Sequence, residues 1–165
     1  KHTCSSAPPF LPLNSHSLPL SALITDKELE KNIPSGHKGG IRRVVCWGGE
    51  TLHIITASTD GTCRVFNFET GRYLRTLTGH QGPVTTVAVS KDEDIKKAIV
   101  VTGGRDTTVR IFYLSSGRNR FVMEGHTAPI VSVDFLQGMA GISVIASCCL
   151  KGEIRLWNRD TGEFL

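Results

Sequence analysis

The sequence predicts an all-β protein built from internal repeats, and three observations support this. The apolar segments are short and rich in β-branched and aromatic residues, and none sustains a helical period. Turn signals such as Asp60-Gly61 and Thr70-Gly71 separate these segments. The 17 glycines among the 165 residues fall mostly at regular places. Short strands joined by glycine-containing turns account for all three observations.

Three sequence landmarks return with nearly the same period. A Gly-His pair begins at residues 36, 79 and 125, so its spacings are 43 and 46 residues. A Thr-Gly or Ser-Gly pair begins at residues 70, 116 and 161, with spacings of 46 and 45. An Arg-aliphatic-aromatic triplet begins at residues 64, 110 and 155 with the same two spacings. Internal repeats of this length are typical of a solenoid, a propeller or an array.

Four short strands are expected in each period. In the first repeat they cover residues 44–47, 52–57, 63–68 and 73–77. In the second they cover residues 84–89, 98–101, 109–114 and 121–123. In the third they cover residues 130–135, 144–146 and 154–157, and residues 164–165 open a fourth. Four strands in about 45 residues are typical of a propeller blade. We therefore predict a β-propeller of four-stranded antiparallel blades, here three blades of an incomplete ring.

Residues 1–35 differ from the rest of the chain. They are rich in Pro and Ser, which favours either a linker or a degenerate preceding blade. Residues 25–30 also have the pattern of a short capped helix, and the sequence does not choose among these readings. The repeats are expected at about 36–78, 79–124 and 125–165.

Composition and cysteine usage narrow the class of protein. The formal net charge is +4, and no run of Lys or Arg is long enough for a nucleic-acid arm. The five cysteines are odd in number and form no C-x-x-C pair, so we expect neither disulfides nor a metal, and no cofactor. We expect Cys46, Cys63 and Cys148 to be buried. A reducing, intracellular location in the cytoplasm or nucleus follows, with no membrane span.

From Gly36 onward the chain resembles the WD-repeat family. The resemblance implies a hydrogen-bonded tetrad of His, a hydroxyl residue, Asp and Trp in each blade. The matching positions are His37, Ser58, Asp60 and Phe66, then His80, Asp106 and Phe112, and finally His126 and Trp157. No repeat has all four members, because Phe66 replaces the indole, Gly104 the hydroxyl and Lys151 the acid. We expect the third blade to be the least rigid.

The residue types His37, Ser58 and Asp60 also occur in hydrolase triads. However, His and Asp return in the second repeat, which suits a structural bond better than a single catalytic site. No Gly-x-Ser-x-Gly elbow is present. We therefore predict a protein that is not an enzyme.

The resemblance implies that partners dock on the Gly-His loops and on the turns before Asp. The corresponding residues are Lys38, Thr59, Gln81, Arg105, Thr127 and Leu150. Among these we favour Arg105, because exposed Arg is common at binding hot spots. The predicted function is a protein–protein interaction scaffold within a multiprotein complex.

Two other functions stay open at this point. One is an RNA-associated propeller in a ribonucleoprotein particle, which the basic pI near 8.9 would suit. The other is a recruiting or regulatory domain of a larger enzyme. Because a propeller needs about 4–8 blades, we also expect a longer chain or a partner chain to close the ring.

Overall fold

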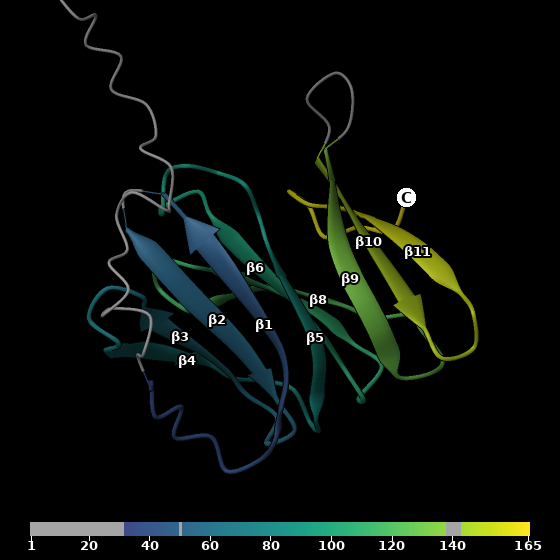
Figure 1. Cartoon of the computed structure of the whole chain (residues 1–165). Helices are drawn as coiled ribbons and strands as arrows, with labels where there is room; N and C mark the ends of the chain where they lie inside the picture. The colour runs from purple at the N-terminus through teal and green to yellow at the C-terminus, as the bar shows by residue number, and fades with distance from the viewer. Residues whose placement is uncertain (1–31, 50, 138–142) are drawn as a thin grey trace, which may run out of the picture. The chain divides into compact units, whose positions relative to one another are not determined.

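The computed structural model describes residues 32–49, 51–137 and 143–165. The chain divides into two units, Lys1–Asn32 and Ile33–Leu165, and all strands given below belong to the second. The described residues form strands and no helix (Figure 1). The helix considered at residues 25–30, and nearly all of the segment 1–35, lie outside the described residues. Among those described, no helix is long and apolar enough to cross a membrane.

The first repeat folds into a four-stranded antiparallel sheet. Its strands pair in chain order and are β1 (Ile41–Gly48), β2 (Leu52–Ser58), β3 (Cys63–Asn67) and β4 (Tyr73–Leu77). The strands were predicted to within three residues at each end. Alternating burial along β3 places Cys63 and Val65 in the core, as the two-residue period of a strand requires.

The second repeat builds the same four-stranded sheet again, and the third builds a sheet of three such strands. The second contains β5 (Val84–Val89), β6 (Ile99–Gly104), β7 (Val109–Tyr113) and β8 (Asn119–Met123), paired in chain order. The third contains β9 (Ile130–Gln137), β10 (Ser143–Cys149) and β11 (Ile154–Asn158). Beyond β11 a single antiparallel bridge joins Trp157 to Phe164. Three sheets of this kind confirm the all-β fold and the incomplete propeller.

The core lies between successive sheets. Strand β5 packs against β1 and β2, and β9 packs against β5 and β6, so the second sheet lies between the other two. One apolar cluster joins the first two sheets through Ile55, Val65 and Val87. A second joins the last two through Val101, Ile111 and Ile145. Each sheet therefore depends on its neighbour to bury its apolar face.

Two of the recurring landmarks meet in space. The glycine before each histidine has a positive φ, and at Gly79 and Gly125 the angles are 136° and 138°. A Cβ on Gly79 would come within 2.7 Å of the Arg110 guanidinium, and one on Gly125 within 2.7 Å of that of Arg155. The backbone angle favours glycine, and a Cβ at either position would also displace the neighbouring guanidinium. In these repeats the glycine of the Gly-His pair therefore lies against the arginine of the Arg-aliphatic-aromatic triplet.

The outer sheets leave apolar and thiol groups uncovered. On the third sheet Ile154 is 74% exposed, and Leu156 and Phe164 are also exposed. On β1 the side chain of Cys46 is exposed, while Cys148 is half-buried. The predicted burial is therefore correct for Cys63 and wrong for Cys46, because no described segment covers that side of β1.

Candidate functional site

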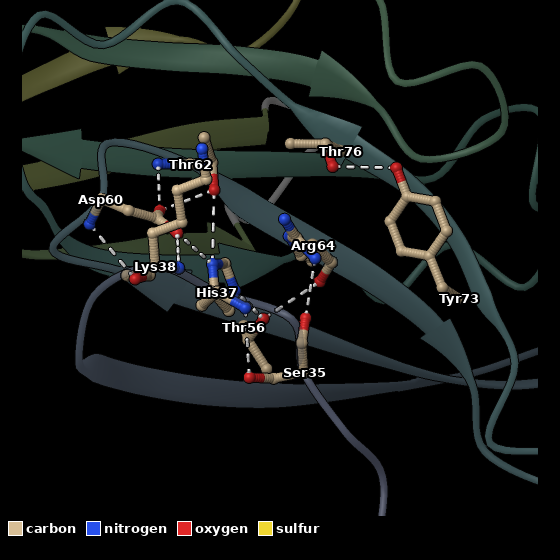
Figure 2. Close-up of polar contacts among 10 residues, drawn as sticks. Ser35, His37, Lys38, Thr56, Asp60, Thr62, Arg64, Tyr73 and Thr76 are labelled. Atoms are coloured by element: carbon tan, nitrogen blue, oxygen red, sulfur yellow. Dashed lines mark hydrogen bonds and ion pairs between the residues drawn. The ribbon is translucent and has the colours of Figure 1, made fainter.

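The first repeat contains a hydrogen-bonded group around His37, where the Gly-His loop meets β2 and the β2–β3 turn (Figure 2). Nδ1 of His37 lies 2.8 Å from Oδ2 of Asp60, and Nε2 lies 2.8 Å from the hydroxyl oxygen of Thr56. The ring is almost fully buried, with 1% of its side chain exposed. Both nitrogens are therefore satisfied by protein groups, as burial demands.

Asp60 accepts several hydrogen bonds from the groups around it. Its carboxylate accepts hydrogen bonds from the backbone amides of Lys38 and Thr62, at 2.9 and 3.0 Å, and from the Thr62 hydroxyl at 2.7 Å. Partial burial alone would raise the pKa of Asp60. The hydrogen bonds from Thr62, His37 and the backbone outweigh burial and hold that pKa well below its usual range. The group fastens the Gly-His loop to the β2–β3 turn.

The structure corrects the expected position of the hydroxyl. The sequence pattern placed it at Ser58, whereas the hydroxyl facing His37 belongs to Thr56, two residues earlier on β2. Ser58 is buried and instead accepts a 3.2 Å hydrogen bond from the backbone amide of Asp60. Residues two apart point to the same face of a strand, so the sequence pattern alone could not separate them.

The second repeat contains the same hydrogen-bonded group, including the hydroxyl. His80 contacts both carboxylate oxygens of Asp106 at 3.0 Å and the Thr102 hydroxyl at 2.8 Å. The sequence pattern placed the hydroxyl position at Gly104, so this repeat was expected to lack it. That expectation was wrong, because the hydroxyl belongs to Thr102, two residues earlier on the strand. Burial lowers the pKa of His80, although the Asp106 carboxylate opposes the shift.

The third repeat departs from this pattern. Nε2 of His126 lies 2.7 Å from the Ser147 hydroxyl, which also accepts a 2.8 Å hydrogen bond from the Trp157 indole. Lys151 replaces the acid, and Nδ1 of His126 is buried without a hydrogen-bond partner. The nearest carboxylate oxygen, of Glu153, is 3.7 Å away. Burial, together with the charge of Arg155, lowers the pKa of His126.

The aromatic positions of the expected tetrad are all buried. Phe66 and Phe112 are 2% and 1% exposed, and Trp157 is 2% exposed. Phenyl rings fill the space but donate no hydrogen bond, so among these three positions only Trp157 supplies an indole donor.

Asp60, His37 and Thr56 are hydrogen-bonded in the sequence acid, histidine, hydroxyl, as in a catalytic triad. Unlike the nucleophile of a triad, however, the hydroxyl is buried. Thr56 is only 6% exposed, and its equivalent Thr102 is fully buried. A nucleophile must reach a substrate, and neither hydroxyl does. Both groups join a Gly-His loop to the turn that follows the second strand of its sheet.

The six predicted partner-binding residues lie at one end of the three sheets, and we call them the histidine-end surface. All six are exposed: Lys38, Thr59, Gln81, Arg105, Thr127 and Leu150. Leu150 is the one large apolar residue of the set, and it is 71% exposed. All six thus lie in loops at the same end of the sheets, and their role in binding stays a prediction.

The same main-chain hydrogen bond holds each part of this surface. The amides of Thr59, Arg105 and Leu150 donate to the carbonyl oxygens of Gly40, Pro83 and Pro129, at 2.9, 2.9 and 3.0 Å. The lysine and glutamine amides are held as well, since Lys38 and Gln81 donate to Asp60 and Asp106 at 2.9 Å. The backbone is fixed, while the side chains at the turn positions project outward.

A polar contact at the opposite end of the sheets was not predicted. The carbonyl of Asp92, between β5 and β6, accepts a 2.9 Å hydrogen bond from the Trp47 indole of the first sheet. Its carboxylate accepts a hydrogen bond from Arg159 of the third sheet. Residues 92–97 are mostly charged, but nothing in the sequence revealed that this loop joins all three sheets.

Comparison with known protein families gives one match. The model of the family described as "WD domain, G-beta repeat" matches residues 29–67, 71–112 and 117–158. The matched segments each end at or one residue beyond the buried aromatic position, and together they cover most of the chain. No curated protein matches the sequence.

Proposed function

Because the chain belongs to the WD-repeat family, whose repeats generally mediate scaffolding between proteins, we propose that the histidine-end surface is its docking site for a protein partner. Domains of this family are typically non-catalytic interaction modules. The observation that carries the proposal is the repeated exposure of the same positions above one fixed main-chain frame. A rigid frame lowers the conformational entropy that a partner must remove on binding.

The side chains of this surface favour an acidic partner segment that also carries apolar groups. Lys38 and Arg105 contribute positive charge, and Lys151 beside Leu150 is exposed as well. Leu150 offers an apolar contact among these charges. Arg105 has no side-chain hydrogen bond or ion pair within the described residues, so its guanidinium is available to a partner carboxylate.

A matched pair of arginines in the second sheet tests the docking site. Arg105 lies in the β6–β7 turn, and Arg118 lies in the β7–β8 turn at the opposite end of the strands. Both are exposed. Proteins cross-linked to the chain in cells are identified by mass spectrometry, and their affinities for the purified wild type and variants are measured. Arg105→Ala combined with Gln81→Ala should weaken binding at least tenfold, while Arg118→Ala should not.

Equal affinity for the wild type and the Arg105→Ala, Gln81→Ala variant would place the docking site elsewhere. Binding that disappears after ribonuclease treatment, and falls steeply with salt, would instead favour the RNA-associated alternative.

We further propose that another blade covers the outer face of the third sheet, supplied by the same polypeptide or by a partner. Ile154 and Leu156 form the exposed apolar part of this face. The second sheet buries apolar side chains against a neighbouring sheet on each of its two faces. An additional blade would cover the outer face of the third sheet in the same way.

A further inference from the structure

We propose that the third repeat holds a Zn²⁺ ion between His126, Cys149 and Glu153. A ring nitrogen of His126, Sγ of Cys149 and a carboxylate oxygen of Glu153 all lie within 4.8 Å of one another. His126 and Cys149 are buried, and Glu153 is partly exposed. Imidazole nitrogen, thiolate sulfur and carboxylate oxygen are the three donor types that Zn²⁺ takes from proteins.

The buried ring nitrogen of His126 is the observation that points to a ligand. In the first two repeats the equivalent Nδ1 faces an aspartate, at 2.8 Å for His37 and 3.0 Å for His80. In the third repeat Nδ1 has no hydrogen-bond partner, although its side chain is fully buried. An unpaired buried nitrogen is costly, and a metal ion would satisfy it.

Three substitutions at one place produce this difference between the repeats. Where the first repeat has Ser58, Asp60 and Thr62, the third has Cys149, Lys151 and Glu153. The aspartate is lost, and a thiol and a longer carboxylate are gained on either side of it. The same ring nitrogen thus faces metal-binding groups in place of a hydrogen-bond acceptor.

The distances are close to those of a tetrahedral site. Oε2 of Glu153 lies 3.7 Å from Nδ1 of His126 and 4.0 Å from Sγ of Cys149. Ligand atoms on one tetrahedral Zn²⁺ are about 3.3–3.6 Å apart, given metal–ligand bonds of about 2.0–2.3 Å. Small movements of the side chains therefore close the site, and a water molecule would complete it beside the exposed carboxylate.

The other nitrogen of His126 is already positioned for metal binding. Nε2 lies 2.7 Å from the Ser147 hydroxyl, which can accept a hydrogen bond from it. A histidine that binds metal through one nitrogen commonly donates the N–H of the other to an oxygen, which sets the tautomer and the ring orientation. The Trp157 indole holds the same hydroxyl at 2.8 Å.

The neighbouring charges set the strength of the site. Nε of Arg155 lies 3.8 Å from Oε2 of Glu153, and Lys151 donates to the Thr127 hydroxyl at 3.3 Å nearby. The ion must compete with Arg155 for this carboxylate, so we expect weaker binding than at a four-ligand zinc finger. On binding, the Cys149 thiol gives its proton to solvent and the thiolate becomes the ligand.

Cobalt is the probe that reports the thiolate directly. The purified chain, stripped with a chelator and kept reduced, is titrated with Co²⁺, and the thiolate-to-cobalt charge-transfer absorption is recorded. We expect a band that saturates at about one Co²⁺ per chain and that Zn²⁺ displaces. The absence of a saturable band in the folded chain would overturn the proposal.

The adjacent cysteine provides a matched control. Cys149→Ser should abolish the band, whereas Cys148→Ser, on the opposite face of β10, should leave it unchanged. Glu153→Gln changes a partly exposed side chain, so the fold should persist, and it should weaken Co²⁺ binding at least tenfold. A band that survives in Cys149→Ser, or the same affinity in Glu153→Gln, would contradict the site. Far-UV circular dichroism verifies that each variant is folded.

Discussion

The histidines of the Gly-His pairs are buried between a carboxylate and a hydroxyl in the first two repeats, and these small groups have large energetic effects. His37 and His80 each satisfy both ring nitrogens with protein atoms. Removing one partner leaves a buried polar atom unpaired, which costs more than the net gain from an ordinary hydrogen bond.

Two threonine and serine variants on β2 separate the roles of neighbouring hydroxyls. Thr56→Val keeps the shape but leaves Nε2 of His37 unpaired, and should lower the free energy of unfolding by about 1–3 kcal/mol. Ser58→Ala removes an acceptor for one backbone amide and should cost about 1 kcal/mol. Urea unfolding at pH 7 measures both values. A larger loss in Ser58→Ala would restore Ser58 as the main partner.

The lowered pKa of Asp60 predicts how the stability of the fold depends on pH. Its pKa is about 3.8 when unperturbed and lower in the fold, so the unfolded chain binds protons first as pH falls. The stabilisation by this carboxylate is therefore complete above about pH 5 and is lost as pH falls through 3.8 toward the lower folded value.

The measurement is the urea midpoint between pH 6 and pH 3. The wild type should lose stability steadily over this range, and Asp60→Asn should lose less because position 60 no longer titrates. Parallel profiles for the two proteins would show that Asp60 does not contribute to the acid sensitivity.

Side-chain partners were harder to predict than residue types. The sequence identified His37, His80, Asp60 and Asp106, because their spacing recurs. It misplaced the hydroxyl, because Thr56 and Ser58 face the same way on one strand. It also did not reveal the cluster of His126, Cys149 and Glu153, because spacing along the chain was the only guide. His126 and Cys149 are far apart in sequence and meet only when the Gly-His loop closes over the β10–β11 turn.

At the scale of the elements, one turn has an unfavourable residue. In the turns between the second and third strands, Gly61, Thr107 and Gly152 occupy equivalent positions, with φ of 85°, 67° and 81°. Threonine is β-branched and adopts this left-handed region with strain, which glycine avoids. The β6–β7 turn is therefore less favourable than the other two.

Reciprocal substitutions test this strain. Thr107→Gly should raise the free energy of unfolding by about 1 kcal/mol, because the relief of strain exceeds the added chain entropy of glycine. A Cβ at Gly152 would meet nothing within 4 Å, so Gly152→Ala isolates the effect of φ and should destabilise by about 1 kcal/mol. Thermal unfolding followed by circular dichroism compares them. Destabilisation by Thr107→Gly would mean that the threonine side chain contributes contacts that outweigh its strain.

The strands themselves were predicted well, and their contacts were not. Apolar runs and turn residues mark where a strand begins and ends, and Tyr73–Leu77 and Val84–Val89 were found exactly as predicted. The contact of Asp92 with Trp47 and Arg159 depends on how sheets pack, which periodicity along one chain does not encode.

At the scale of the whole molecule, the apolar face of the third sheet should drive association. The second sheet has a neighbour on each side, whereas Ile154 and Leu156 are exposed. Exposed apolar area of this kind favours contact with another surface. In the chain studied alone, we expect the weight-average mass to rise with concentration.

Sedimentation equilibrium tests this association with a matched leucine. The Ile154→Lys, Leu156→Lys variant should remain closer to the monomer mass of 18.0 kDa at concentrations where the wild type associates. Leu150→Lys changes an equally apolar residue that lies in a turn, and should associate like the wild type. A wild type that stays monomeric at every concentration would contradict the prediction.

The main-chain bonds from Thr59, Arg105 and Leu150 to Gly40, Pro83 and Pro129 make the turn conformation nearly independent of those side chains. Random substitution at these three positions, with Lys38, Gln81 and Thr127, should therefore yield a collection of variants with similar folding and different surfaces. Selection from such a collection could redirect the protein to new targets without re-engineering its stability. The same independence lets mutation explore new binding preferences in evolution at little structural risk.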